Sequence, residues 1–480
     1  MNQHCKTIRT TLVLASTAAM STMAGEVGTN ALVEAPSPQL NGGTKPALTK
    51  PAAAPPQNWN FHVQNTVIVQ GYPGFASKYS GPNSLSGGGQ TRETISLDLM
   101  AGVRLWRGAE AHIDAMMYQG FGVNNAVGVD GFPNGEAFRL GTDVPNGNIP
   151  RLFIRQTIGL GGAEEDVPDD QLTLAGSRDV SRLTFTLGRF SAKDIFDNNA
   201  YANDPRTQFM NWALMANEAW DFPADALGYT TGLAVELNQP NWTLRYGFFQ
   251  MPRYSNSLTA EDRIFKWPYD GSAQDGPILE AWGMVTEFER RFSINAHPGA
   301  IRLLGYVNRA NMGSYQDAVN NATPGNPADI TASAQFRYKY GFGLNVEQEI
   351  AKNVGVFSRL GWSDGQNQAW AFSDVDYTMT GGGSINGEAW NRPDDTFGLA
   401  GVMNGLSTVH REFFAAGGTG ILAGDGNLNY GWEKIIETYY DFKIWKSLHS
   451  TLDYQFIDNP AFNQDRGPVS VFAARVHWEF

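Results

Sequence analysis

The side chains best suited to bind a small polar molecule are concentrated in residues 191–226, a stretch dense in aspartate, asparagine and aromatic residues. Carboxylates, amides and guanidinium groups bond to hydroxyls, and aromatic rings stack on the C–H faces of sugar rings. Loops of this length in compact folds are usually functional. The residues we expect beside a solute pathway are Asp194, Asp197, Asn198, Asn199, Tyr201, Asp204, Arg206 and Trp212. The alternative is a segment that caps the fold from outside.

Motifs for covalent or metal chemistry are absent from the sequence. It contains no Walker A loop, no HExxH and no Gly-x-Ser-x-Gly elbow. Its seven histidines are scattered without metal-ligand spacing. Glu287 and Glu289 lie two residues apart, so on a strand both point into the same solvent, as in a hydrated wall rather than a glycosidase pair. We expect no catalytic residue, no metal and no cofactor.

An alternation of apolar and polar residues positions these side chains. In the last segment Phe472, Val476, Trp478 and Phe480 share one face, and Arg475, His477 and Glu479 share the other. The same pattern recurs at 95–104, 242–248 and 336–347. A period of two marks strands with one apolar and one polar face.

The length of these segments favours a membrane barrel over a soluble β-sandwich, the other fold that alternates. Many run roughly 10 to 17 residues, against about 5 or 6 in soluble proteins. Aromatic residues also favour the segment ends, as in transmembrane β-barrels. We therefore predict an all-β, antiparallel transmembrane barrel of about 16 strands, with 18 as the alternative. The expected strands are 60–71, 92–105, 109–121, 150–160, 181–190, 227–238, 241–251, 278–292, 299–311, 334–350, 354–364, 369–384, 394–406, 431–445, 447–459 and 468–480.

This order predicts which connectors lie on each side of the membrane. If the first strand starts in the periplasm, the long connectors are extracellular and 191–226 is the third, folded inward. The sixth, near 365–368, is expected to be short. The periplasmic connectors 161–180 and 385–393 are longer than tight turns, and the acidic stretch 163–171 has no assigned role.

The polar face of the strands should line an aqueous lumen. Both charge signs are present there in similar number, which suits a neutral polyhydroxylated solute, because a wall of one sign selects ions of the other. The wall residues we expect along the pathway are Arg155, Arg182, Arg245, Arg337, Arg359, Glu347 and Asp441.

The N-terminus has the plan of an export signal. A basic stretch with Lys6 and Arg9 precedes an apolar run, and small residues lead to a cut after Ala24. The expected organisation is a signal peptide at 1–24, a Pro/Ala-rich flexible linker at 25–58 and a barrel at 59–480. The formal charge of −13 argues against a nucleic-acid partner.

Several segments resemble the carbohydrate-selective porins of Gram-negative outer membranes, the OprB family. They are VIVQGYPGFASKYSGPNSL at 67–85, GFPNGEAFRLG at 131–141, LTFTLGRFSAKDIFDNNAYANDPRTQFMNWALM at 183–215, RPDDTFGLAGVMNGLSTVHREFFAAGG at 392–418 and LNYGWEKIIETYYDF at 428–442. The resemblance implies a sixteen-stranded barrel, a constricting third loop and uptake of sugars across the outer membrane. The terminal Phe480 resembles the signal read by the barrel-assembly machinery.

The leading hypothesis is a passive channel for mono- or oligosaccharides, embedded in outer-membrane lipid as a monomer or homotrimer. A general or anion diffusion porin without sugar selectivity and a polysaccharide-export barrel are the alternatives. A barrel-borne enzyme or secreted glycan hydrolase would need a catalytic constellation that the sequence does not display.

Overall fold

The computed structural model describes residues 56–137, 141–252, 254–256 and 279–480. All of them belong to one compact unit, Pro38–Phe480. The predicted signal peptide and residues 25–55 of the predicted linker lie outside the described residues.

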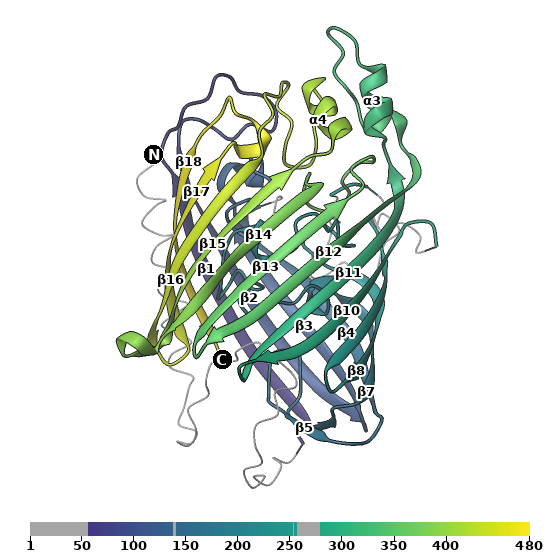
Figure 1. The fold of residues 1–480 in the computed structure, drawn as a ribbon, viewed down its shortest axis with the longest axis vertical. Coiled ribbons are helices and arrows are strands. Elements are labelled where there is room, and N and C mark those ends of the chain that lie inside the picture. The colour runs from purple at the N-terminus through teal and green to yellow at the C-terminus, as the bar shows by residue number, and fades with distance from the viewer. Residues whose placement is uncertain (1–55, 138–140, 253, 257–278) are drawn as a thin grey trace. The chain divides into compact units, whose positions relative to one another are not determined.

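Sixteen antiparallel strands close into one barrel, in which β1 pairs with β18 (Figure 1). The barrel strands are β1 (Trp59–Tyr72), β2 (Gln90–Trp106), β3 (Ala109–Gly120), β4 (Thr142–Gly159), β7 (Arg182–Phe190), β8 (Thr230–Gln239), β9 (Trp242–Gln250), β10 (Trp282–Ile294), β11 (His297–Met312), β12 (Gln335–Ala351), β13 (Val354–Ser363), β14 (Tyr377–Gly387), β15 (Arg392–Gly405), β16 (Glu433–Trp445), β17 (Leu448–Asp458) and β18 (Val469–Glu479). Two further strands, β5 (Glu164–Val167) and β6 (Gly176–Asp179), pair only with each other. The prediction of sixteen barrel strands is confirmed, and the alternative of eighteen is wrong.

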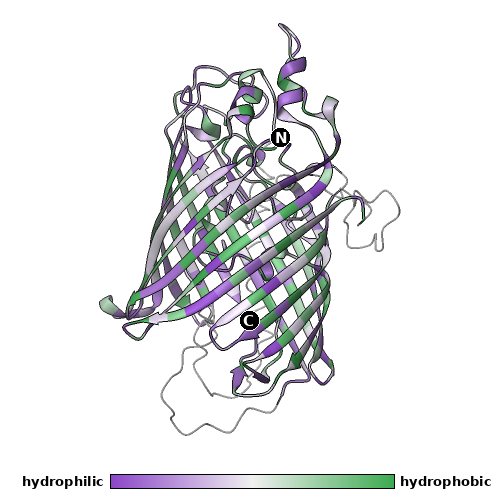
Figure 2. Ribbon diagram, turned by 45° about the vertical axis from the view of Figure 1, so that its right-hand side comes forward, coloured by the Kyte–Doolittle hydropathy of each residue, from purple (hydrophilic) through white to green (hydrophobic). Residues whose placement is uncertain are grey.

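Apolar and polar residues alternate along the strands of the wall (Figure 2). Their exposure shows that this alternation gives the wall two different faces. Large apolar residues such as Leu187, Phe342 and Leu452 are exposed on the outer face, whereas polar strand residues such as Asp98 and Arg359 are buried on the inner one. Trp106 and Trp445 end their strands at 60% and 58% exposure, as expected of an aromatic belt.

Tight turns join the strands at the end where β1 begins. Asn295 and Ala296, with φ of 51° and 67°, form the two-residue link between β10 and β11, the left-handed pair that suits the twist of a hairpin. At the same end, the backbone of Phe480 exchanges two hydrogen bonds with Val63, at 2.8 and 3.0 Å. The last residue therefore completes the closure of the barrel.

Short helices lie in the connectors. They are η1 (Val123–Ala126), η2 (Ala192–Asp194), α2 (Trp212–Met215), α3 (Tyr315–Asn321), η3 (Thr331–Ser333), η4 (Glu388–Trp390), α4 (Thr408–Ala415) and η5 (Pro460–Phe462). Among the described residues, no helix is long and apolar enough to cross a bilayer.

The strand predicted at 369–384 begins only at Tyr377. The preceding Trp370 and Ala371 are buried, and their N–H groups donate to the Asp221 carboxylate at 2.8 and 2.7 Å. The alternation there reflects packing of a loop rather than a strand. The sixth connector, 364–376, is consequently longer than predicted. β4 also begins at Thr142, before the predicted residue 150. Its pairing with β3 contains two register shifts, which interrupt the regular alternation of the strand.

Candidate functional site

The third connector, residues 191–229 and called L3 below, begins at a fixed point on the wall. Ser191 and Asp194 close a capping box around η2. The Asp194 carboxylate also receives two bonds from Arg151 of β4, at 2.9 and 2.7 Å. Arg151 in turn donates to Asp114 of β3 at 2.8 Å. A bidentate, charge-assisted pair thus sets the direction in which L3 leaves β7.

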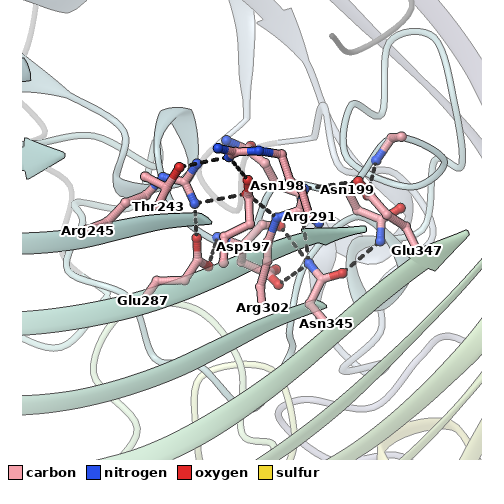
Figure 3. Close-up of polar contacts among 12 residues, drawn as sticks. Asp197, Asn198, Asn199, Thr243, Arg245, Glu287, Arg291, Arg302, Asn345 and Glu347 are labelled. Carbon is pink, nitrogen blue, oxygen red and sulfur yellow. Dashed lines mark hydrogen bonds and ion pairs between the residues drawn. The ribbon is translucent and has the colours of Figure 1, made fainter. Parts of the chain in front are cut away.

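Asp197 anchors L3 at other strands of the ring (Figure 3). It has φ of 56° and is 2% exposed. Its carboxylate accepts bonds from Arg359 at 3.1 Å and Asn345 at 2.8 Å, and its N–H donates to Glu287 at 2.8 Å. Burial alone would raise the pKa of Asp197, but Arg359 and then Lys193 outweigh it and lower the pKa to about 2. Asp197 is therefore ionised at neutral pH and fixes L3 through charge.

The next residues of L3 rest on β12. The Asn199 amide donates to Asn345 at 2.7 Å, and the Ala200 N–H donates to Glu347 at 2.7 Å (Figure 3). Asn198 is half-buried, and its amide bonds back to the Ile195 carbonyl. These bonds hold the backbone of L3 against the wall.

Tyr201 packs closely against Gly355 of β13. A Cβ at that position would stand 1.8 Å from the Tyr201 ring. Glycine is therefore required in the wall so that L3 can approach this closely.

Arg359 of β13 joins two distant parts of L3. It is 0% exposed, and it donates to the carbonyls of Ala202 and Leu214 at 2.7 and 2.9 Å as well as to Asp197. An arginine can be buried so completely only when its donors are paired. Its guanidinium thus holds both halves of L3 in one arrangement.

Two further wall residues bind the second half of L3. Glu437 of β16 accepts bonds from the N–H groups of residues 210–211, at 2.6 and 2.9 Å. Arg475 of β18 donates to the carbonyls of Pro205 and Gln208 at 2.6 and 2.8 Å. Side chains of β2, β4, β10, β12, β13, β16 and β18 therefore contact L3, which places it across the interior of the barrel.

Aromatic residues add apolar anchors. Phe196 and Phe209 are both 0% exposed. Phe196 packs edge-on against Phe249 of β9 at 6.2 Å between centroids, and Phe209 packs against Tyr439 of β16 at 4.9 Å. L3 is thus part of the packed core as well as of the polar network.

Arg206 is a partly accessible charge of L3. Its side chain is 12% exposed and pairs with Asp98 of β2 at 3.3 Å and Glu136 of the second connector at 3.0 Å. Asp204 accepts the Arg206 N–H at 2.9 Å and is half-buried. This part of L3 offers charges of both signs.

Trp212 is the first residue of α2 and lies in an aromatic stack. Phe132 and Phe222 lie nearly parallel to it, at 6.3 and 6.2 Å between centroids, and Phe372 is 4.9 Å away. Trp212 itself is half-buried. An apolar ring face therefore lies in the same connector as the polar groups.

Comparisons with known proteins identify the family of the chain. Residues 82–480 match the model of a family described as carbohydrate-selective porin, OprB family. The chain belongs to the OprB family of carbohydrate-selective porins. It is accordingly a passive channel of the Gram-negative outer membrane for the uptake of sugars. Families of this kind act as channels rather than as enzymes.

The fold of this porin is also found in solved structures. The high-pH structure of Pseudomonas putida OprB superposes with a TM-score of 0.65 at 18% identity, covering 88% of this chain and 94% of that one. The low-pH structure of the same protein gives 0.46 at 13% identity, covering 88% and 93%. Pseudomonas aeruginosa OccK2 (OpdF) gives 0.43 at 9% identity, covering 88% and 97%. No curated protein sequence matches the chain.

Two of the predicted wall arginines of this porin form ion pairs on the wall. Arg245 of β9 bonds to Glu236 at 3.1 Å and to Glu287 at 2.8 Å (Figure 3). Arg155 of β4 bonds to Glu110 at 3.0 Å. Their side chains are 12% and 18% exposed, so each is a paired charge that water can still reach.

The other three predicted wall residues bond to partners outside L3. Arg182 pairs with Glu165 of β5 at 2.9 Å, and Arg337 pairs with Asp317 of α3 at 2.9 Å. Asp441 accepts bonds from Thr451 and lies 2.7 Å from His449, near the periplasmic end.

Some residues of the network were not predicted. Arg302 of β11 donates to Glu289 and Glu347 at 2.9 and 3.0 Å, and Asn345 bonds to L3 (Figure 3). Arg302 alternates with the outward Ile301 and Leu303, so the period of two was a sufficient signal for it. The ring stack around Trp212 gave no such signal, because L3 supplies only Trp212 and Phe222, while Phe132 and Phe372 come from two other connectors.

Proposed function

We propose that L3 and the wall beside it form the selective constriction of this porin and favour neutral sugars. One observation carries the proposal: the three accessible arginines that border or belong to L3 are each paired with carboxylates. Arg151, Arg206 and Arg245 are each 12% exposed, and each stands within 3.3 Å of two or more carboxylates. Ion pairs have little net field but many donors and acceptors, and these can exchange bonds with sugar hydroxyls.

Two roles follow for the residues expected along the pathway. Those nearly or fully buried by L3 contacts fix its position: Asp197, Asn199, Glu347 and Arg359. Those that keep an accessible surface line the path: Asp194, Asn198, Tyr201, Asp204, Arg206, Trp212, Arg155 and Arg245. We assign Arg337 to the extracellular entrance, and Arg182 and Asp441 to the periplasmic exit, from the strand ends on which they lie.

Trp212 is the aromatic contact in this proposal. Its half-buried ring keeps accessible surface for contact with a sugar, while the neighbouring rings keep it in place. No residue of the path is assigned a covalent step, so transport proceeds by diffusion and weak binding.

The alternatives differ in what the lining would have to provide. An anion porin needs an excess of accessible positive charge, and the pairing of Arg151, Arg206 and Arg245 disfavours it. A polysaccharide exporter needs a lumen wide enough for a polymer, and the crossing of L3 disfavours that.

We also propose that the exposed terminal Phe480 is read by the barrel-assembly machinery, since it is 69% exposed at the end of the closing strand. The outer apolar face suits contact with lipid or with further copies, and both a monomer and a homotrimer are compatible with it.

A planar-bilayer experiment tests the proposal. Purified protein is inserted, and glucose, maltose and an uncharged nonsugar of equal size are added in turn. We expect the sugars to block the open-channel current at concentrations where the nonsugar does not. Equal responses to all three solutes would leave a porin without sugar selectivity. A strong preference for anions would support the diffusion alternative instead.

A further inference from the structure

The connector between β4 and β7 is unlike the other periplasmic links. It forms a hairpin from β5 and β6, closed at its base by a bond from Val180 N–H to the Ala163 carbonyl at 2.8 Å. At its tip Asp170 and Thr173 exchange two backbone bonds of 3.1 Å. We call residues 163–180 the periplasmic hairpin. Tight turns of a few residues would suffice to join two strands, so the extra length calls for an explanation.

The tip of the periplasmic hairpin is bonded to the inner face of β1. The Asn60 amide donates to the Asp169 carboxylate and the Asp170 carbonyl, each at 2.9 Å, and to the Thr173 carbonyl at 3.2 Å. Asn60 is 4% exposed and alternates with the outward Trp59 and Phe61. The tip is therefore turned toward the lumen.

Contacts with other strands place the tip across a sector of the ring. Arg155 of β4 donates to the Leu172 carbonyl at 2.8 Å, and the Leu174 N–H donates to Glu110 of β3 at 3.4 Å. Leu174 is 3% exposed, and Leu172 packs against the aromatic cluster that includes Phe153. From β1 to β4 is three strand spacings, roughly 14 Å. The hairpin tip thus lies along the sector of the mouth formed by β1 to β4.

The same sector carries the accessible charges of L3. Gln171 at the tip donates to Gln64 of β1 at 3.0 Å, and Gln64 donates to Asp98 at 2.9 Å. Asp98 is the residue that pairs with Arg206 of L3. On β4, Arg155 binds the tip and Arg151, four residues away on the same strand, binds L3. A solute that passes L3 on this side therefore meets the hairpin next.

We propose that the periplasmic hairpin is a second narrowing, in series with L3, and that it limits the size of the solute that leaves the channel. The inference rests on the proposed function, since it concerns the exit of the same path. In a channel with two narrow parts in series, removing either one raises the conductance, and removing the periplasmic one raises the size limit for polymers that enter from the periplasmic side.

The decisive variant replaces residues 163–179 by a short Asn-Gly turn. A second, milder variant is Asn60→Ala, which removes three bonds to the tip. Asn65→Ala is its matched control, because Asn65 lies on the same strand and bonds instead to the Ser96 carbonyl. Single-channel conductance and exclusion of polyethylene glycols of graded size are measured for each.

We expect the replacement to raise conductance roughly 1.5- to 3-fold and to admit larger polymers from the periplasmic side. Asn60→Ala should shift both in the same direction by less, and Asn65→Ala should resemble the wild type. A replacement variant that conducts with unchanged conductance and polymer limit would overturn the inference while leaving the sugar channel intact. If the replacement does not fold, equal behaviour of Asn60→Ala and Asn65→Ala would overturn it. If sugars fail to block the current of the wild-type channel, that result would instead count against the proposed function.

Discussion

L3 lies inside the ring of strands and the tip of the periplasmic hairpin is bonded to the inner face of that ring, but the two segments are held differently. L3 is fixed by wall residues that are almost completely buried, such as Arg359 and Glu437 at 0% exposure. The hairpin is held by neutral donors and carbonyls, by the buried Leu174 and by the Asp169 carboxylate, which remains exposed to water. Buried charges lose much when one partner is removed, whereas exposed polar contacts lose little.

This difference separates a permanent constriction from an adjustable one. L3 belongs to the core of the barrel, so displacing it would expose Phe209 and leave Asp197 as an uncompensated charge. The hairpin can leave its position without uncovering a comparable core. This contrast predicts that substitutions at the anchors of L3 cost more stability than substitutions in the hairpin.

The largest effect is expected for Arg359→Met. It leaves the ionised Asp197 buried without its arginine, and the carbonyls of Ala202 and Leu214 lose their donor. We expect a loss of about 3–5 kcal/mol in the free energy of unfolding, as for other broken buried pairs. Urea titration of the detergent-solubilised barrel measures it.

The same variant should raise single-channel conductance, because L3 is released from the wall. Arg290→Met is the control, since Arg290 is an exposed neighbour of the inward Glu289 and Arg291 on β10. Equal stability of the two variants would show that L3 is not held by the buried pair.

The second-largest effect is expected on the binding of sugar in the channel. Trp212→Ala combined with Arg206→Ala removes the ring face and the accessible guanidinium of L3 but keeps its buried anchors. We expect the concentration of maltose that half-blocks the channel to rise about 10- to 100-fold, from losing roughly 1.4–2.7 kcal/mol of stacking and hydrogen bonding.

Trp242→Ala with Arg290→Ala is the matched control, because these two residues pair across β9 and β10 on the outer face. Unchanged maltose block in the L3 double variant would remove L3 from the recognition of sugar.

The third effect is a change in the stability of the protein with pH. Glu218 of L3 is 3% exposed. Burial, followed by the neighbouring Glu433 carboxylate, raises the pKa of Glu218 well above its usual range. The folded protein therefore retains a proton that the unfolded chain releases, so stability is full below the unfolded pKa and falls as pH rises toward the folded one.

Glu218→Gln should remove that penalty and add about 1–2 kcal/mol of stability at pH 7, with no gain at pH 4. Part of the pH dependence should persist, because burial also raises the pKa of Asp130 and Asp374. Urea titrations at both pH values measure the difference, with the exposed Glu412→Gln as reference. A gain of equal size at pH 4 would contradict the assignment to Glu218.

The inward and outward faces of the barrel strands were predictable from the sequence, because they depend only on the alternation of neighbouring residues. Whether a residue such as Asp98 faces water or lipid depends only on its parity along the strand, and the closed barrel confirms it. The length of residues 191–226 also indicated an inward loop. The loop that contains Trp370 was mistaken for a strand because packing inside the lumen imitates alternation.

The pairings inside the lumen were not predictable in this way. Arg359 and Asp197 are 162 positions apart. They meet only because closure of the ring and the path of L3 bring them together. The acidic stretch 163–171 likewise gave no sign of a hairpin, since the partners of its tip are spread over β1, β3 and β4.

The smallest loss of stability is expected for a substitution in the periplasmic hairpin. Leu172→Ala removes a half-buried side chain that packs beside Phe153, and we expect it to cost about 1 kcal/mol or less. Conductance should rise slightly, because the tip spends more time away from the wall, while the half-blocking concentration of maltose should stay that of the wild type. Leu160→Ala, in the same connector at 53% exposure, is the control. A loss as large as that of Arg359→Met would mean that the hairpin is as integral to the core as L3, and the contrast between a permanent and an adjustable constriction would then fail.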